Sequence, residues 1–194
     1  MASKGKAKVL TSEEFKRLLR VANEGKWAAR NLAIIYCSFG LGLRAKEIAS
    51  LTIGDVCDED YHLLEEISLT HDMTKGGKPR YVYPVNNRVR KALTAHLETL
   101  QGKPFDRPLF ETQKKSRFTP NAMQKWFAAL FKSAGISGAS SHSGRRTYIN
   151  TLIEEGVDIK SVSALAGHSK ITTTAIYFDN NPVKLKRIAE KGLV

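Results

Sequence analysis

Apolar residues along this chain recur mostly at the three- and four-residue spacing of helices that pack on a core. Thr11 and Glu14 form a capping-box pattern that predicts the start of an amphipathic helix. The face of this helix expected to turn inward carries Phe15, Leu18, Leu19 and Ala22. Residues 27–39 are apolar on nearly every side and predict a largely buried second helix. Further helices are predicted over residues 88–100, 120–134, 144–155 and 159–166.

Strand-like segments lie between the second and third of these helices. Residues 62–69, 71–75 and 80–84 predict a small antiparallel sheet. Within it, TKGGKPRYVYPV, residues 74–85, predicts a tight Gly-Gly hairpin in which Lys75 ends the first strand. The pattern as a whole predicts an α+β fold that is mainly α, with a small antiparallel sheet and no second domain.

The segment 103–118 interrupts the helical pattern. It contains Pro104, Pro108 and a KKSR run, and it predicts a surface loop. Two interpretations remain open, a loop that lies on DNA and a solvated connector.

The composition narrows the class of partner and the compartment. Thirty-one Lys and Arg against nineteen Asp and Glu give a net charge of +12, which suits a polyanion but does not by itself exclude an ordinary basic protein. Two cysteines, Cys37 and Cys57, are too few for a disulfide framework, which favours a cytoplasmic location. No apolar run is long enough to span a membrane. The histidines outside the segments discussed next lack metal-ligand spacing and are expected at the surface: His62, His71 and His96.

The stretch from His142 to Tyr177 collects residue types that suit phosphodiester chemistry. It holds a His-x-x-Arg pair, His142 and Arg145, then a Gly-His-Ser around His168, and Tyr177 nine residues further on. A guanidinium matches phosphate oxygens bidentately, and an activated phenol is a covalent nucleophile. Any one of these residues alone is usually an ordinary surface or core residue, but the combination predicts a catalytic site.

A second arginine and a lysine lie upstream. Residues 39–56, FGLGLRAKEIASLTIGDV, form an apolar segment broken at Gly40 and Gly42 that delivers Arg44 near a helix start. Glu47 follows on the same helical face, where it can orient the arginine, although an ordinary surface ion pair is the alternative. Lys75 beside its glycine turn has a similar alternative, a solvated turn residue.

From about Leu10 to about Asp179, the chain resembles the catalytic domain of the tyrosine recombinase (phage integrase) family. LTSEEFKRLL resembles the opening helix of that family, GLRAKEIASL its first arginine box and KGGKPRYVYP its β-hairpin lysine. HSGR, LAGHS and TTTAIY resemble its second box and its nucleophile segment. Arg146 is a departure, because many relatives carry histidine there. The amino-terminal DNA-clamping domain of most members has no counterpart in this sequence, which leaves autonomous recombination in question.

The resemblance implies a reaction and a set of residues that perform it. Tyr177 is expected to attack a phosphodiester, leaving a 3′-phosphotyrosyl bond and a free 5′-hydroxyl, without any cofactor or metal. Arg44 and Arg145 are expected to clamp the non-bridging oxygens, and His168 to donate a further hydrogen bond there. His142 is expected to assist proton movement at the tyrosine, and Lys75 to protonate the departing 5′-oxygen. The implied catalytic set is thus Arg44, Lys75, His142, Arg145, His168 and Tyr177, with Glu47 in support.

The resemblance also implies partners, and several functions remain open. The partner is expected to be double-stranded DNA, bound by a homo-tetramer on synapsed sites, with possible accessory DNA-bending or directionality factors. A tail over residues 180–194 is expected either to dock on a neighbouring protomer or to be a frayed terminus. Residues 1–9 are expected to form a basic arm. The chain is then a complete short recombinase that integrates, excises or inverts DNA, a catalytic fragment of a longer integrase, or a DNA-binding regulator that retains the fold.

Overall fold

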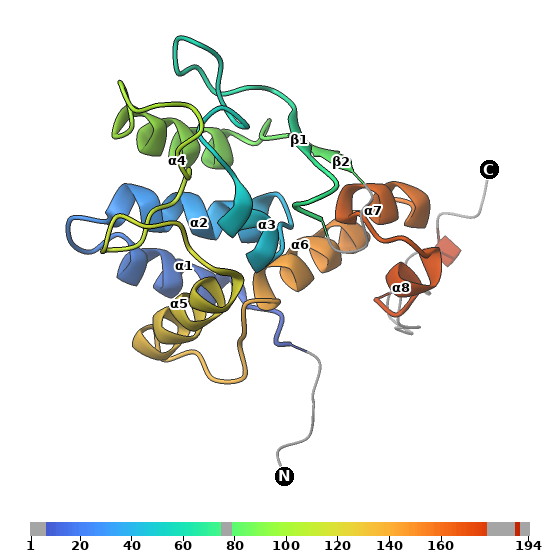
Figure 1. Cartoon of the computed structure of the whole chain (residues 1–194). Coiled ribbons are helices and arrows are strands. Elements are labelled where there is room, and N and C mark those ends of the chain that lie inside the picture. Colours follow the sequence, from blue (N-terminus) through green and yellow to red (C-terminus); the bar gives the residue numbers. More distant parts are fainter. Residues whose placement is uncertain (1–6, 75–78, 178–188, 191–194) are drawn as a thin grey trace.

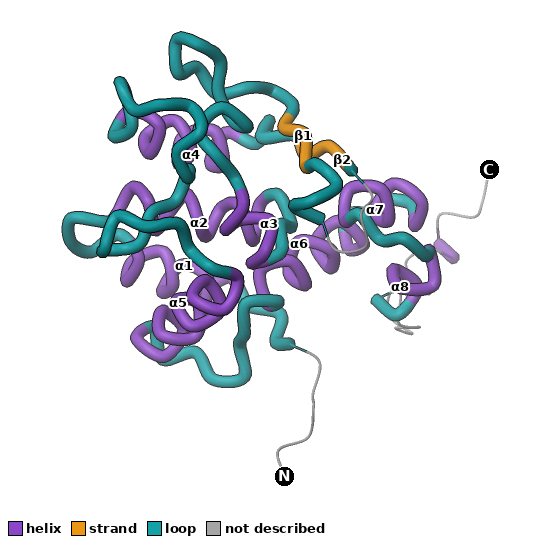
Figure 2. Tube along the Cα trace, in the orientation of Figure 1, coloured by secondary structure: helices purple, strands orange, loops and turns teal. Residues whose placement is uncertain are grey.

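The structure, a computed structural model, describes residues 7–74, 79–177 and 189–190. Its elements in chain order are α1 (Ser12–Ala22), α2 (Ala28–Gly40), α3 (Ala45–Ser50), β1 (Ile67–Leu69), β2 (Arg80–Val82), α4 (Asn87–Glu98), α5 (Pro120–Ser133), α6 (Ser143–Glu154), α7 (Ile159–Ala166) and α8 (Ile171–Ala175). Figure 2 shows a mainly helical chain with one small sheet, which confirms the predicted fold class.

Helix α2 is the central element of the core. It packs against α1, α4 and α6, as its position in Figure 1 shows. Its sequence is apolar almost all round, and Ala33, Ile34 and Ile35 are fully buried, as predicted. A second, smaller apolar cluster joins α6 to α7 through Ile149 and Val162, and the ring of Tyr177 packs against it. The site described below therefore rests on α6 and α7, beside the main core.

Capping residues mark the start of α1 and both ends of α7. At α1 the predicted capping box is present: the Thr11 hydroxyl accepts from the Glu14 N–H, and the Glu14 carboxylate accepts from the Thr11 N–H. At α7 the Asp158 carboxylate accepts from the backbone N–H groups of Lys160 and Ser161. That helix ends at Gly167, whose φ of 61° lies in the left-handed region that glycine adopts without strain. The chain leaves this cap directly into His168.

The sheet is smaller than predicted. Two strands pair antiparallel, with Ile67 opposite Val82 and Leu69 opposite Arg80. The expected strand over 71–75 is wrong for residues 71–74, which form a turn because the Thr74 N–H donates to the Thr70 carbonyl (3.2 Å). The first strand ends at Leu69, so the connection to β2 is longer than a two-residue hairpin. Lys75 itself lies outside the described residues.

The first predicted strand is also shorter than expected, because its first residues fold back on themselves. The His62 N–H donates to the Asp58 carboxylate (2.8 Å), and the Leu64 N–H donates to the Val56 carbonyl (3.0 Å). These local bonds use the backbone groups that a longer ladder would need. Only residues 67–69 of the predicted 62–69 therefore pair with β2.

The segment 103–118 contains no helix or extended strand, as predicted, but its middle and its C-terminal end pack on the core. Leu109, Phe110 and Phe118 are buried, and Arg117 donates to the Ser50 carbonyl (2.8 Å). The KKSR run at 114–117 is exposed. The proposed arm and tail, 1–9 and 180–194, fall largely outside the described residues. Among those that are described, no helix is long and apolar enough to cross a membrane.

His96 lies in the core, so its expected place at the surface is wrong. Its side chain belongs to the apolar face of α4, with Leu93 and Leu97, and its residue is only 4% exposed. Nε2 donates to the Leu109 carbonyl (2.8 Å), and the ring stacks on Phe110 at 5.2 Å between centroids. Burial lowers the pKa of His96 to about 4, so the ring is neutral at pH 7.

We expect this histidine to make the fold acid-sensitive. Because the folded-state pKa lies below the unfolded value of 6.5, the unfolded chain binds the extra proton and stability falls as pH drops from 6.5 towards 4. The full effect is at most about 3 kcal/mol. Urea unfolding between pH 4 and 7 should show a shallower pH dependence for His96→Gln, which keeps a donor for Leu109, than for the wild type. Parallel pH profiles for the two proteins would contradict this assignment.

Candidate active site

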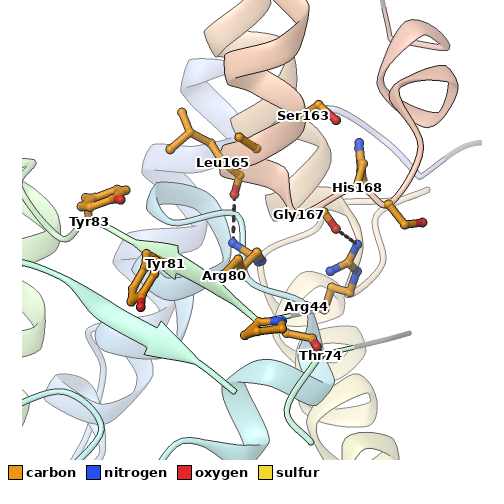
Figure 3. A pocket seen from close by; sticks show the side chains of 12 residues that line it. Arg44, Thr74, Arg80, Tyr81, Tyr83, Ser163, Leu165, Gly167 and His168 are labelled. Carbon is orange, nitrogen blue, oxygen red and sulfur yellow. Dashed lines mark hydrogen bonds between the residues drawn. The ribbon is translucent and has the colours of Figure 1, made fainter. Parts of the chain in front are cut away.

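Arg44 lies at the start of α3 and faces a cavity of about 370 Å3. Its Nη1 donates to Glu47 Oε1 (2.7 Å), and its Nη2 donates to the Gly167 carbonyl at the end of α7 (3.3 Å). The side chain remains 21% exposed. Arg44 thus lies at a helix start, as the sequence predicted, and its guanidinium lines the cavity (Figure 3).

Glu47 forms a buried ion pair, so the alternative of an ordinary surface pair is excluded. Its side chain is 0% exposed. Oε2 accepts from the Arg44 backbone N–H (2.7 Å) and from Arg80 Nη2 (2.9 Å), while Oε1 accepts from Arg44 Nη1. The carboxylate therefore lies between two guanidiniums and orients both of them.

Arg145 belongs to α6, and its side chain is buried in the interior. Its Nη1 donates to the Gly42 carbonyl (2.8 Å), and its Nη2 donates to the Ala166 carbonyl. Burial, together with the positive charges of Arg44 and Arg80, lowers the pKa of Arg145 to about 9, so it is still a cation at pH 7. Tyr177 is close enough to Arg145 to affect the same pKa.

His168 and Tyr177 lie together at the other side of the site. Their rings are stacked, with centroids 6.1 Å apart and an interplanar angle of 17°. The Nδ1 atom of His168 is 2.8 Å from the hydroxyl of Thr174, a fully buried residue of α8. Burial, together with the charges of Arg145, Arg44 and Arg80, lowers the pKa of His168 to about 4. The imidazole is consequently neutral at pH 7, with one ring nitrogen that can donate a hydrogen bond and one that can accept.

A second cavity, of about 420 Å3, opens on the tyrosine side. It is lined by residues that include His142, Arg145, Arg146 and Tyr177. His142 is exposed and immediately precedes α6. Arg146, the departure from the family pattern, donates from Nη1 to the Ala7 carbonyl (2.6 Å) and so joins α6 to the chain before α1. The first cavity is lined by Arg44 and His168. Arg145 lines the second cavity, and it binds the Ala166 carbonyl next to the Gly167 carbonyl that Arg44 binds.

One residue of this site was not expected from the sequence. Arg80 lies on β2, lines the first cavity, and is bonded to Glu47 and to the Leu165 carbonyl. The signal available in the sequence was only that Arg80 falls on the same face of the predicted strand as the apolar Val82. Lys75 lies outside the described residues. The other members of the expected catalytic set lie around the two cavities: Arg44, His142, Arg145, His168 and Tyr177, with Glu47 bonded to Arg44. The described part of the chain contains no cluster of three or more His, Cys, Asp or Glu that could hold a metal ion.

The comparisons with known proteins establish the family of the chain. The model of the phage integrase family matches residues 8–183, and the chain belongs to that family. Among curated relatives, the chain is 31% identical to tyrosine recombinase XerA of Thermococcus kodakarensis over 187 residues, and 32% identical to tyrosine recombinase XerC of Bacillus pumilus over 177 residues. These alignments cover 95% and 87% of the chain, but only 62% and 55% of the relatives. The chain thus spans less than two thirds of either protein.

Solved structures extend the similarity to the fold. A crystal structure of XerA recombinase aligns with a TM-score of 0.73 at 25% identity, covering 96% of this chain and 65% of that one. A structure of the Tn1549 transposon integrase in complex with transposon right end DNA aligns with a TM-score of 0.80 at 21% identity, covering 100% of this chain and 68% of that one. The mainly helical fold with its small sheet is therefore that of tyrosine recombinase catalytic domains.

Proposed function

We propose that this chain is the catalytic domain of a site-specific recombinase, which cuts and rejoins double-stranded DNA through a covalent bond to Tyr177. The observation that supports this most is the position of Arg145. Its side chain lines the same cavity as Tyr177, and it donates to the Ala166 carbonyl, next in the chain to the Gly167 carbonyl that Arg44 binds. A phosphodiester held by the two cations would therefore lie beside the phenol that attacks it.

In the proposed reaction the Tyr177 oxygen attacks phosphorus, and the bond from phosphorus to the 5′-oxygen breaks. The tyrosine proton passes towards His142, which lines the same cavity, and the leaving 5′-oxygen takes a proton from Lys75. Rejoining is the reverse, with a 5′-hydroxyl attacking the phosphotyrosine. Since one phosphoester replaces another, no external energy source is required.

Because His168 is neutral at pH 7, only one of its ring nitrogens can donate a hydrogen bond to the phosphate. If Nε2 donates to a non-bridging oxygen, then Nδ1 must accept, and the Thr174 hydroxyl 2.8 Å away is the donor it needs. Arg44, Arg145 and His168 would together surround the charge that builds up in the transition state. Thr174 fixes the histidine tautomer in this arrangement.

The net charge of +12 and the relatives support DNA as the partner. Solved relatives include XerH bound to its difH substrate and a lambda integrase dimer bound to a COC′ core site. By analogy, we propose that this chain assembles as a homo-tetramer on two DNA sites, with accessory factors setting direction. We place the reaction in the cytoplasm, where the free Cys37 and Cys57 stay reduced.

Trapping covalent products on host genomic DNA would test this function. Denaturing the mixture and sequencing the DNA attached to protein should recover fragments that share one short site. Integration, excision and inversion would be distinguished by where those sites lie. Binding to DNA with no covalent product would favour the regulator that retains the fold.

Lys75 is tested separately, because a lysine beside a glycine turn is so often only a solvated residue. A 5′-oxygen needs a proton as it leaves and a 5′-sulfur does not, since a thiolate is a good leaving group. We expect Lys75→Ala to cleave normal DNA about 10²- to 10⁴-fold more slowly and to recover on DNA with a bridging 5′-sulfur. Single-turnover cleavage of the two substrates measures this.

Two variants serve as controls for that measurement. Arg145→Ala should recover much less on the sulfur substrate, since its proposed role is at the non-bridging oxygens. Lys78→Ala, three residues along the same segment, should cleave both substrates almost normally. If Lys78→Ala is the variant rescued by sulfur, the general acid is Lys78 and not Lys75.

A further inference from the structure

Three arginines from three different elements converge on the last turn of α7. Arg80 Nη1 donates to the Leu165 carbonyl (2.9 Å), Arg145 Nη2 to the Ala166 carbonyl, and Arg44 Nη2 to the Gly167 carbonyl (3.3 Å). Figure 3 shows the first and last of these bonds. Carbonyls at a helix C-terminus lack intrahelical partners and carry partial negative charge, so they suit cations. Two of the three arginines belong to the proposed phosphate clamp, and the third is Arg80.

Arg80 differs from Arg44 in its exposure and in its partners. Its side chain is only 7% exposed, against 21% for Arg44. Both terminal nitrogens of Arg80 are occupied by protein acceptors, Glu47 and the Leu165 carbonyl. Its Nε is buried with no hydrogen-bond partner among the described residues. An unpaired buried donor costs stability, so this arginine is poorly explained as a stabilising residue alone.

The stem of Arg80 also packs against the backbone that leads into His168. A Cβ on Gly167 would lie 2.2 Å from Arg80 Cδ, so the close approach requires glycine there. The left-handed φ of 61° at the same residue also favours glycine. Arg80 therefore contacts the helix cap from which His168 projects, and through Glu47 it also reaches Arg44.

We propose that Arg80 is a positioning residue for the phosphate clamp, and this rests on the proposed function. Arg80 and the Arg44 backbone N–H together occupy Glu47 Oε2. The Arg44 guanidinium is thereby left with the other carboxylate oxygen, Oε1, and stays turned towards Gly167 and the cavity. Without Arg80, the Arg44 fork can rotate to grip both oxygens of Glu47, because a bidentate pair is the stronger arrangement. That rotation would withdraw Arg44 from the phosphate.

Arg80→Met tests this, because methionine fills most of the volume and Glu47 keeps Arg44 as a partner. On a fragment recovered by the trapping experiment, the cleavage rate at saturating DNA should fall about 10- to 100-fold, by analogy with the loss when a residue that orients the ligands of a metal site is removed. DNA affinity should stay within about twofold, because the Arg80 side chain is 7% exposed and both its terminal nitrogens are bonded to protein acceptors. Arg30→Met is the matched control: Arg30 is equally buried but lies at the start of α2, where it stacks on Trp27 and donates to the Glu111 carbonyl. It should change the melting temperature and leave the cleavage rate unchanged.

A double variant separates positioning from general destabilisation. If Arg80 acts through Arg44, then Arg80→Met should add less than about twofold to the loss already caused by Arg44→Ala. Full multiplication of the two losses, or a single Arg80→Met variant that cleaves like the wild type, would overturn the proposal. Failure of the wild type to form any adduct is a different result, since it would refute the proposed function itself.

Discussion

Replacing Tyr177 by phenylalanine should abolish the covalent protein–DNA adduct, with a loss of cleavage on the order of 10⁴-fold or more. The substitution removes only the attacking oxygen. The ring can keep its stacking on His168 and its packing against the cluster of α6 and α7. We therefore expect DNA binding to be retained, so that chemistry and affinity separate cleanly.

The measurement is a denaturing gel with labelled DNA, compared with a gel-shift titration for affinity. Tyr148→Phe is the matched control, because this phenol also packs against the cluster between α6 and α7 but has no proposed role. It should form adduct like the wild type. The wild-type adduct should also form in excess EDTA, since no metal takes part in the proposed step; dependence on a metal would point to a nuclease. Adduct from Tyr177→Phe at the wild-type level would show that another group is the nucleophile.

The helical part of the fold could be predicted because its signals are local. The capping box of Thr11 and Glu14 and the apolar run of α2 each depend on a few neighbouring residues, and both are present in the structure. The predicted helix over 159–166 has the observed bounds, with Asp158 and Gly167 as its caps. Helix α8 was missed because five residues rich in threonine carry little helix propensity.

The sequence predictions that were wrong concern segments and residues whose structure is set by turn bonds and tertiary contacts. The strand predicted over 71–75 fails over its described residues because turn bonds at Thr70 and Thr74 satisfy the backbone. His96 was expected at the surface from its lack of ligand spacing, yet its position on the apolar face of α4 buries it against Leu109 and Phe110. Helical periodicity was the better guide to that residue than its chemistry.

The candidate site was predictable where residues lie close in sequence and less so elsewhere. Arg44 and Glu47 share a helical turn, so their ion pair follows from spacing. No local pattern shows that Glu47 is wholly buried or that Arg80, 33 residues later, shares its carboxylate. The bond between Arg44 and Gly167 likewise joins positions 123 residues apart. Such pairings depend on how β2, α3 and α7 pack together, and this packing cannot be predicted from the spacing of residues in the sequence.

Arg44→Ala and Arg145→Ala should each lose cleavage far more than DNA affinity. Each guanidinium is proposed to act on charge that builds up at the non-bridging oxygens in the transition state, so its removal costs about 10²- to 10³-fold in rate. Affinity comes instead from the many other Lys and Arg behind the +12 charge, and it should fall steeply with added salt for wild type and variants alike. Single-turnover cleavage at saturating DNA, beside a salt titration of binding, measures both quantities.

Lys114 provides the contrasting variant, because it is exposed in the 103–118 loop and has no proposed role in chemistry. If that loop lies on DNA, Lys114→Ala should weaken binding and reduce its salt dependence, while cleavage at saturation stays normal. The arginine variants should show the opposite pattern. Arg145→Ala should also lower the melting temperature, since this buried side chain joins the Gly42 and Ala166 carbonyls, so its cleavage is measured well below that temperature. An arginine variant that binds poorly but cleaves normally once saturated would show that the residue holds DNA and does not act on the transition state.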